Sequence, residues 1–491
     1  MAFDDVLPEL DTDILAKAME KAGRLGATYA DVRLEATYSE SAEAENGDIK
    51  RLEVATGTCL GVRALAGGAW GFSSVDIPEP RALRARLLRA TERAVRQARA
   101  ISRFGEVRLA PTKPVVKDVP LRVKKEPWTA EEKKDLIADV TRRMRAVEGT
   151  AVAIGELDHT LFDWHFASTE GARISRRWLL TNGEFLVQAV GPGGSQMWWR
   201  PFGVAGGLEL MRGERDPERI GLELAKKVVA LTREAKVPEA GKTTVITTPE
   251  FDQLLVHEVM GHPSEADRVL GGESAWAGRA WWSDEVGARV GSELVTAVSD
   301  ARPIERHAGG YGTFPFDDEG VPAKRVVNVE RGVLKEFLHS RQTAAIVGVP
   351  PNGGMRAVAA SDVPIIRMTN TYFESDPEGP STLEECIEDV RDGVILGWSS
   401  IPSIDSIRLR FQINAYEGWR VRNGEVVGLL KNIALLGSTP DFFKTIRLVG
   451  NDRTWRLHSL PNCGKGDPMQ IARVGNGGPV MVGEGMIVGV A

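Results

Sequence analysis

The residues best suited to chemistry lie in one short stretch, LLVHEVMGHPSEAD, from Leu254 to Asp267. It holds His257, Glu258 and His262. Imidazole nitrogens bind zinc, and a neighbouring glutamate moves the protons that hydrolysis requires. The zinc-peptidase motif H-E-x-x-H places its histidines four residues apart, but here they are five apart. The stretch is therefore either a metal site with an unusual turn or an ordinary helix end where three such residues happen to lie close together.

The element that carries these histidines must depart from a regular α-helix if both bind one metal. Residues 248–250, Thr-Pro-Glu, form a helix start with a cap, a first-turn proline and an acidic residue. On such a helix, residues four apart differ by ~40° about the axis and residues five apart by ~140°. Gly261 tolerates unusual backbone angles, and His262 avoids the α region because it precedes Pro263. We expect a helix break at Gly261 or a π-bulge, either of which turns His262 towards His257.

A catalytic zinc site needs a third protein ligand and an open position. Cys463, in the glycine-rich segment LPNCGKGDPMQ, is a candidate because a thiolate binds zinc and glycines allow close backbone approach. The alternative for Cys463 is a small apolar residue buried in a turn. The segment lacks P-loop spacing, and no cysteine-protease signature surrounds it, although a Cys–His nucleophile pair stays open. The other five histidines lie in contexts that single none of them out: His159, His165, His307, His339 and His458.

The bulk composition limits the class of protein. The chain has 491 residues and a net charge of −6, so it has no broad basic field to hold nucleic acid. Its start lacks the features of a secretory signal, and no run approaches the roughly 18 apolar residues of a membrane span. Three cysteines do not make a disulfide framework and suit a reducing compartment. We expect a cytoplasmic protein that binds neither nucleic acid nor membranes.

Patterns of apolar residues, caps and turns predict the elements that position these side chains. Helices are predicted at 11–27, 80–103 and 216–235, with a further helix from a capping box formed by Thr129 and Glu132. An antiparallel meander is predicted from 150–167, 172–193 and 198–211, and linkers at 110–128 and 236–242. The remainder is strand-rich, with hairpins at Arg331–Gly332 and Asn423–Gly424 and a short helix capped by Ser381 with Glu384.

These elements predict an α+β protein in three parts. Two N-terminal α+β units of antiparallel sheet with helices, at 1–112 and 113–238, precede a largely antiparallel β domain at 239–491 that carries the metal and the catalytic residues. The tip GPGGSQMWWRPFG, at 191–203, places two tryptophans either over the active site or a partner, or in a buried pair.

With both candidate motifs in hand, the chain resembles the TldD/PmbA family of modulator proteins, of the DNA gyrase modulator type, and specifically its metal-bearing TldD side. The H-E-x-x-x-H motif marks that side, and NCGKGDPMQ is similar to the loop that supplies the third ligand, here Cys463. Further matches are DDEGVPAKR, SRQTA, NGGMRA and RMTNTYF, and near the start GATYADVRLE and GVRALAGGAWGFSS. The resemblance covers nearly the whole chain. It departs at Pro263 and Ser264, where many members have glycine and an apolar residue.

The resemblance implies a cytoplasmic metallopeptidase that acts on unfolded or extended peptides. It implies a homodimer, or a heterodimer with a paralogous TldE/PmbA-like subunit that lacks the motif. One Zn²⁺ per chain, or another divalent metal such as Fe²⁺, would be held by His257, His262 and Cys463. Glu258 would act as general base.

Further residues are predicted around this centre. Arg367, Asn462 and Gly464 are predicted to contact the substrate, which we expect to bind as a β-strand at a sheet edge. Glu265 and Asp267 are candidate acceptors for ligand N–H groups, with solvent-facing charge as their alternative. The alternative function is a non-catalytic, metal-stabilised subunit that binds peptides or modulates another protein. A third reading is a cysteine hydrolase that uses Cys463 without metal.

Overall fold

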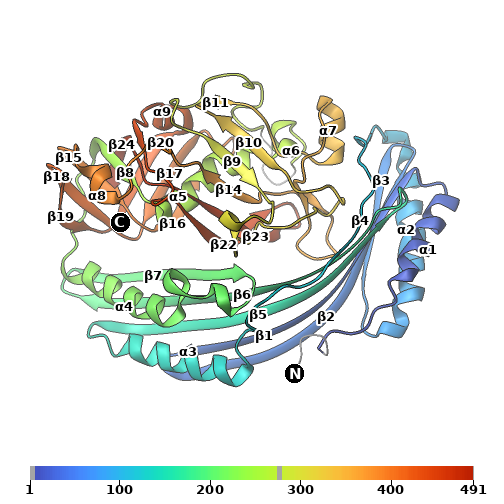
Figure 1. Cartoon of the computed structure of the whole chain (residues 1–491), viewed down its shortest axis with the longest axis horizontal. Helices are drawn as coiled ribbons and strands as arrows, with labels where there is room; N and C mark the ends of the chain where they lie inside the picture. The colour runs from blue at the N-terminus through green and yellow to red at the C-terminus, as the bar shows by residue number, and fades with distance from the viewer. Residues whose placement is uncertain (1–5, 274–278, 490–491) are drawn as a thin grey trace.

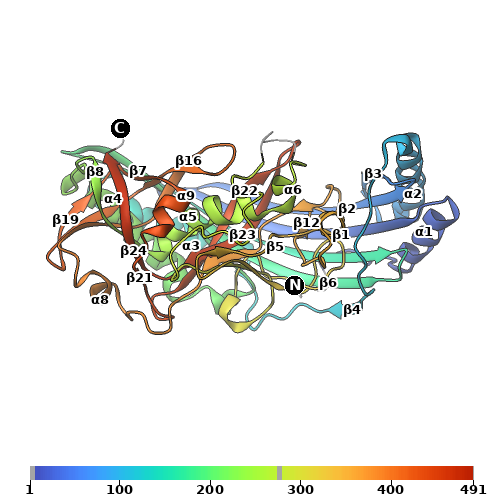
Figure 2. The same cartoon turned by 90° about the horizontal axis from the view of Figure 1, so that it is seen from above.

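The structure is a computed structural model that describes residues 6–273 and 279–489. These residues form the predicted α+β architecture with mostly antiparallel sheet. A curved sheet of long strands makes a cradle, and the C-terminal part of the chain lies on its concave side (Figure 1). Seen from above, the molecule is elongated, with helices α1 (Asp13–Arg24) and α2 (Leu83–Ala100) at one end and α8 (Leu383–Ile387) at the other (Figure 2).

The cradle is one seven-stranded sheet with the order β3-β2-β1-β5-β6-β4, and β7 also pairs with β6. Its strands are β1 (Tyr29–Glu45), β2 (Asp48–Ala66), β3 (Ala69–Asp76), β4 (Val116–Val119), β5 (Thr150–Ser168), β6 (Arg173–Gly191) and β7 (Gly194–Ala205). The predicted meander is confirmed as β5, β6 and β7. The linker predicted at 110–128 is wrong in part, because β4 pairs in parallel with the first half of β6. Strands from both sides of residue 112 thus share one sheet, and the three-domain division stays a prediction.

Helices cover the outer face of the cradle. At one end, α1 and α2 bury Val32, Leu34 and Val62 of the sheet, and at the other, α3 (Ala130–Arg145) and α4 (Pro217–Arg233) bury Leu157 and Phe185. The predicted capping box of Thr129 and Glu132 starts α3. Within 6–273 and 279–489, every helix is too short or too polar to cross a lipid bilayer.

The C-terminal part packs helix α5 (Pro249–Val256) between two sheets. The larger sheet has the order β16-β17-β20-β24-β8-β15-β18-β19, with β21 beside β24, and the smaller has β11-β10-β9-β14-β23-β22. Strands β16 and β22 are therefore edge strands. The larger sheet consists of β8 (Gly241–Thr247), β15 (Asp392–Leu396), β16 (Ser399–Ile404), β17 (Arg410–Ala415), β18 (Gly418–Arg422), β19 (Glu425–Leu430), β20 (Ile433–Ser438), β21 (Leu448–Val449) and β24 (Met481–Gly489). The smaller consists of β9 (Ala297–Asp300), β10 (Arg325–Glu330), β11 (Val333–Leu334), β14 (Asn370–Phe373), β22 (Arg456–Lys465) and β23 (Gln470–Gly478).

Turn chemistry explains where the local predictions succeed. The hairpins at Arg331–Gly332 and Asn423–Gly424 are confirmed, and all four residues have positive φ. The cap of α8 lies one residue beyond the predicted Ser381. The Thr382 side chain accepts from the Glu385 N–H, and the Glu385 carboxylate accepts from the Ser381 N–H. Serine and threonine are both favoured caps, so the sequence alone does not separate adjacent candidates. The remaining short elements are α6 (Ala266–Val269), α7 (Arg341–Val347), α9 (Thr439–Lys444), β12 (Met355–Arg356) and β13 (Ile365–Ile366).

Buried charges join the cradle to the C-terminal part. Arg63 of β2 binds Asp31 of β1 and also lies 3.3 Å from the carboxylate of Glu319, which belongs to the C-terminal part. Arg341 of α7 donates two 2.8 Å bonds to Glu170 beyond the end of β5. Glu35 of β1 lies in the same interface, where burial and the charge of Asp318 raise its pKa to about 8. Ionic contacts as well as apolar packing therefore fix the two parts against each other.

Candidate metal centre

The two motif histidines lie on a π-helical turn. Helix α5 passes directly into π-helix His257–Gly261, in which the His262 N–H donates to the His257 carbonyl, and a 3₁₀ turn follows. Bonding from i to i+5 brings residues five apart to the same side of the helix. The His257 and His262 ring centres lie 4.8 Å apart with planes at 87°. The predicted π-bulge is confirmed, and it explains how two histidines five residues apart can face the same point.

Gly261 is required for space rather than for its backbone angles. Its φ of −67° and ψ of −64° are helical and available to any residue. A Cβ at this position would lie 2.0 Å from the Met368 sulfur, and Met368 is itself fully buried. The expectations of unusual backbone angles at Gly261 and of a non-helical His262 are both wrong. His262 is also helical, with φ −59° and ψ −44°, because the π turn absorbs the extra residue.

Cys463 reaches the same point from strand β22. The β22–β23 register shifts between Leu460 and Cys463, and Cys463 then pairs with Ala472. Its Sγ lies 3.6 Å from His262 Nε2. The candidate ligand atoms of His257, His262 and Cys463 all lie within 4.8 Å of one another, and all three residues are buried.

Both histidines are oriented by acceptors on their outer nitrogens. His257 Nδ1 donates to Asn476 Oδ1 at 3.1 Å, while the Asn476 amide donates to the Thr371 carbonyl at 3.2 Å. His262 Nδ1 donates to Glu265 Oε2 at 3.0 Å. With Nδ1 held as a donor, Nε2 of each neutral imidazole is the nitrogen available to a metal at the centre, as in metal-binding histidines.

The two predicted acidic acceptors have different positions. Glu265 contacts His262 directly and is itself held by Arg268 at 3.1 Å and Lys465 at 3.2 Å. Asp267 contacts no ligand histidine among the described residues but binds Lys465 Nζ at 2.7 and 2.8 Å. Asn476 was not predicted, because its role depends on the pairing of β23 beside α5 and no local pattern signals it.

The charges at the centre favour a thiolate. Burial opposes ionisation of Cys463, yet His257, His262 and Arg367 together hold the pKa of its thiol well below the ordinary value. Burial likewise disfavours charge on His257, but Cys463 and Glu258 raise its pKa to about 9. A buried thiolate that needs positive charge beside it is the electrostatic setting of a cation site.

The donor set fits zinc. Two imidazole nitrogens and one thiolate make a three-ligand set that leaves a coordination position open, and the same donors also accept Fe²⁺. The hydrogen bonds that the two histidines donate to Asn476 and Glu265 fix the tautomers that metal binding requires. His257, His262 and Cys463 are therefore the residues that would hold a metal here.

Glu258 lies beside the centre in an ion pair. Its Oε2 binds Arg408 Nη1, which comes from the loop between β16 and β17. Burial by itself raises the pKa of Glu258, but Arg408, His257 and His262 lower it below the ordinary value. Glu258 is thus an ionised carboxylate that can accept a proton at neutral pH. Arg408 was not singled out from the sequence, because 150 residues separate it from Glu258.

These side chains open into a cavity of 580 Å³. Asn462 and Gly464 line it, as do residues of both edge strands, β16 and β22. Arg367 does not, since it is buried and its guanidinium donates to the Gln470 and Cys463 carbonyls. Arg367 therefore braces the β22–β23 hairpin and does not stand where it could contact a substrate in this cavity, contrary to the prediction.

The two tryptophans of the 191–203 segment differ in position: one lines the cavity and the other is buried. Trp199 lines the cavity at the metal centre. Trp198 is fully buried and stacks on Tyr416, with ring centres 4.9 Å apart. Adjacent residues on a strand face opposite sides, so one tryptophan forms core and the other forms cavity wall.

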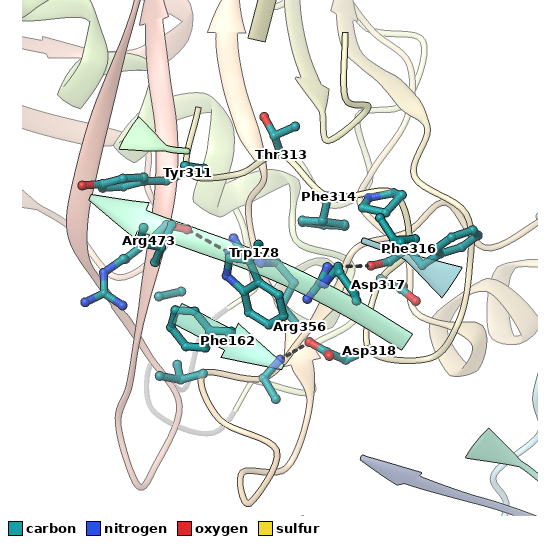
Figure 3. A pocket seen from close by; sticks show the side chains of 18 of the residues that line it. Phe162, Trp178, Tyr311, Thr313, Phe314, Phe316, Asp317, Asp318, Arg356 and Arg473 are labelled. Carbon is teal, nitrogen blue, oxygen red and sulfur yellow. Dashed lines mark hydrogen bonds between the residues drawn. The ribbon is translucent and has the colours of Figure 1, made fainter. Parts of the chain in front are cut away.

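A separate cavity of 190 Å³ lies between the cradle and the C-terminal part (Figure 3). The stacked rings of Phe162 and Trp178 form one wall. Arg356 in this cavity donates to the Met368 carbonyl at 2.6 Å and to the Arg473 carbonyl at 2.9 Å. None of the candidate ligands lines it. Arg356 therefore braces the segment that holds Met368, whose sulfur lies against Gly261.

Comparisons with known proteins find similar chains and a matching fold. A family model described as PmbA/TldA metallopeptidase C-terminal domain matches residues 240–489, and one described as PmbA/TldA metallopeptidase domain 1 matches residues 30–98. A metalloprotease of Methanothermobacter thermautotrophicus is 31% identical over 489 residues, which cover 98% of this chain and 100% of that protein. A zinc metalloprotease TldD homolog of Saccharolobus solfataricus is 33% identical over 264 residues, covering 54% and 55%. The crystal structure of TldE from Thermococcus kodakarensis shares the fold with a TM-score of 0.72 at 16% identity, covering 97% of this chain and 100% of that one.

Proposed function

Because the chain belongs to the PmbA/TldD family of metallopeptidases, we propose that it is a zinc-dependent peptidase that hydrolyses unfolded or extended peptides. The observation that carries the proposal is the cluster of His257, His262 and Cys463 at the wall of a cavity that also exposes the carboxylate of Glu258. A purely structural metal site has no need of an ionised carboxylate or of a cavity beside it.

The residues at the centre have separate roles in the proposed hydrolysis. Zinc, when bound, supplies Lewis acidity for hydrolysis of an amide bond. Glu258 accepts a proton from the attacking water and returns it to the nitrogen of the leaving amine. Arg408 holds the Glu258 carboxylate in place and keeps it ionised before attack. A thiolate ligand leaves the centre less electrophilic than three neutral histidines would, so we expect slow turnover.

We propose that the substrate binds as an extended strand. Cys463 lies on β22, at the edge of the smaller sheet, and the cavity is also bordered by β16, at the edge of the larger sheet. Edge strands have unpaired main-chain groups, which recognise a peptide backbone with little regard to sequence. Asn462 and Gly464 stand at this edge as substrate contacts. Peptides with proline at the paired positions should therefore resist cleavage, and rapid cleavage of them would count against strand pairing.

We propose that the protein works in the cytoplasm as a dimer. Its three cysteines are free thiols, which suits a reducing compartment. The partner is either a second copy or a TldE/PmbA-like paralogue that lacks the metal motif, and the likeness to a TldE structure supports the paralogue. Size measurement of the chain alone and with such a paralogue distinguishes the two.

A cysteine hydrolase is the competing function that one observation favours. Cys463 lies 3.6 Å from an imidazole nitrogen and its pKa is lowered, as in a thiolate nucleophile. The orientation of both histidines towards one point, however, supports a shared cation rather than a single Cys–His pair. Chelators should abolish activity of a metallopeptidase and leave a cysteine hydrolase intact.

The first experiment measures metal per chain by elemental analysis in the wild type, Cys463→Ala and Glu258→Gln. We expect about one zinc in the wild type, much less in Cys463→Ala, and unchanged metal in Glu258→Gln, whose peptide cleavage should fall by roughly 10²–10⁴. Glu425→Gln, at an exposed hairpin, is the control and should change neither. Full metal with full cleavage in Glu258→Gln would reject the mechanism. No metal in the wild type after zinc is supplied would leave the non-catalytic peptide-binding subunit as the better account.

A further inference from the structure

A second cavity, of 680 Å³, adjoins the cavity at the metal centre. Pro201 and Trp398 line both cavities, so the two meet at these residues. Strand β7 forms part of the shared wall: Trp199 lines the catalytic cavity and Arg200 lines the adjoining one. A peptide that leaves the catalytic cavity past Trp398 therefore enters the second cavity, which we call the basic cleft.

The basic cleft has more positive than negative side chains. Seven basic side chains line it, against three carboxylates. Four of the seven form ion pairs with carboxylates of the chain. Arg200, Arg212 and Arg215 form no ion pair with any residue that the structure describes. Arg215 donates to the Ala308 and Leu457 carbonyls, so Arg200 and Arg212 are the guanidinium groups left to attract an anion from elsewhere.

Arg200 is the better placed of the two. Its guanidinium lies 4.5 Å above the ring centre of Trp398, the residue shared by both cavities. Its Nε is buried without a hydrogen-bond partner among the described residues, and burial lowers its pKa. His458 Nε2 in the same cleft makes no hydrogen bond among the described residues and has only the Glu250 carboxylate near it, at 3.9 Å. Unsatisfied donors of this kind cost free energy in the free protein and are satisfied when a ligand with acceptor oxygens binds.

We propose that the basic cleft binds carboxylates of the peptide substrate, from acidic side chains or from the C-terminal carboxylate, within a few residues of the bond that is cut. Planar guanidinium groups pair with carboxylates in a bidentate manner, and the Trp398 ring fixes one of them in position. This inference rests on the proposed peptidase function and adds to it the chemical class of the substrate. The cleft would give selectivity by charge to an edge-strand interaction that is otherwise indifferent to sequence.

The test uses the full-length, zinc-loaded Glu258→Gln chain, so that binding is measured without cleavage. Four fluorescent peptides of one length combine either glutamates or glutamines near one end with either a free or an amidated C-terminus. Fluorescence anisotropy gives the Kd of each. Arg200→Gln and Arg212→Gln are the test variants; Arg212 is exposed, so its loss should not disturb folding. Arg84→Gln, exposed on α2, is the matched control.

We expect an acidic peptide to bind about tenfold more tightly than its neutral counterpart, and the preference to weaken with salt. Arg200→Gln and Arg212→Gln should each reduce the preference at least threefold, and Arg84→Gln should not. The glutamate and the C-terminal arms identify which carboxylate is bound. Equal affinity for all four peptides, or a preference unchanged in both variants, would overturn the inference. Displacement by a single-stranded oligonucleotide at lower concentration than by the acidic peptide would also overturn it, in favour of a nucleic-acid cleft.

Cleavage by the wild type separates this inference from the proposed function. Cleavage without charge preference would keep the peptidase and reject the carboxylate site. Charge-selective binding with no cleavage of any of the four peptides, in the chain alone or with its paralogue, would keep the carboxylate site and reject the peptidase.

Discussion

In the proposed reaction, the ion pair of Glu258 with Arg408 sets the charge and orientation of the general base. A base in a buried cavity tends to hold its proton, because burial favours the neutral form. The guanidinium of Arg408 reverses that tendency and fixes the carboxylate in one orientation. Arg408 acts through Glu258, so it is a positioning residue for the proposed reaction.

Replacement of Arg408 should therefore change the pH dependence of cleavage. In Arg408→Gln the pKa of Glu258 should rise, because its largest favourable charge interaction is lost. The ionised base then disappears at higher pH, so the acid limb of the kcat profile should move upwards. Arg408→Lys should restore part of the shift, and metal content should stay constant in both. An unchanged acid limb in Arg408→Gln would show that this pair does not set the state of the base.

Asn476 tests the orientation of the histidines. Asn476→Ala removes the acceptor of His257 Nδ1 but no candidate ligand. Changes to such supporting contacts typically weaken metal binding 10–100-fold. Competition with a chromophoric chelator measures the zinc Kd of each chain, and thermal unfolding in excess zinc checks that the fold persists. Unaltered affinity would mean that packing alone orients His257.

At the scale of helices, turns and strands, local sequence patterns predict some features and miss others. The π turn, the capping box at Thr129 and both hairpins follow from local chemistry, because each is decided within a few residues. The strand β4 and the brace made by Arg367 depend on partners 57 or more residues away, so no local pattern reveals them. For the same reason the candidate ligands could be proposed from motifs, whereas Asn476, Arg408 and the basic cleft required the assembled sheets.

The packing of the π turn gives a prediction at this scale. Gly261→Ala places a Cβ against the sulfur of buried Met368, so the turn or the methionine must move. Such overpacking costs about 1–3 kcal/mol. Urea unfolding should show this loss, and zinc affinity should fall because His262 follows directly. Gly428→Ala, where an added Cβ meets nothing within 4 Å, is the control and should be neutral. Equal stability of Gly261→Ala and wild type would show that Met368 moves aside freely.

At the scale of the whole molecule, the cradle is fixed to the C-terminal part by buried charge, and Glu35 makes that interface sensitive to pH. The unfolded chain ionises Glu35 near pH 4.5, whereas the folded chain keeps it protonated up to about pH 8. Unfolding therefore releases a proton between these values, and stability falls as pH rises through them. The slope for one proton is about 1.4 kcal/mol per pH unit.

Glu35→Gln should remove this pH dependence. Urea unfolding of both chains at pH 5, 6.5 and 8 gives the difference in free energy of unfolding, in which contributions from other groups cancel. The variant should gain on the wild type as pH rises and be the more stable chain at pH 8. A constant difference across the three pH values would place the pKa of Glu35 near its ordinary value in the folded protein.

The separation of the candidate ligands along the chain has a consequence for biosynthesis. His262 and Cys463 are 201 residues apart, and they meet only after β22 and β23 have paired beside α5. Contacts between such distant segments form late, since a long loop must close first. A ribosome-bound chain that exposes the histidines still lacks the thiolate and the cavity wall. If the chain is the peptidase proposed above, the nascent chain therefore cannot cleave peptides, and activity arises only once the tertiary fold that shields the chain from cleavage has formed.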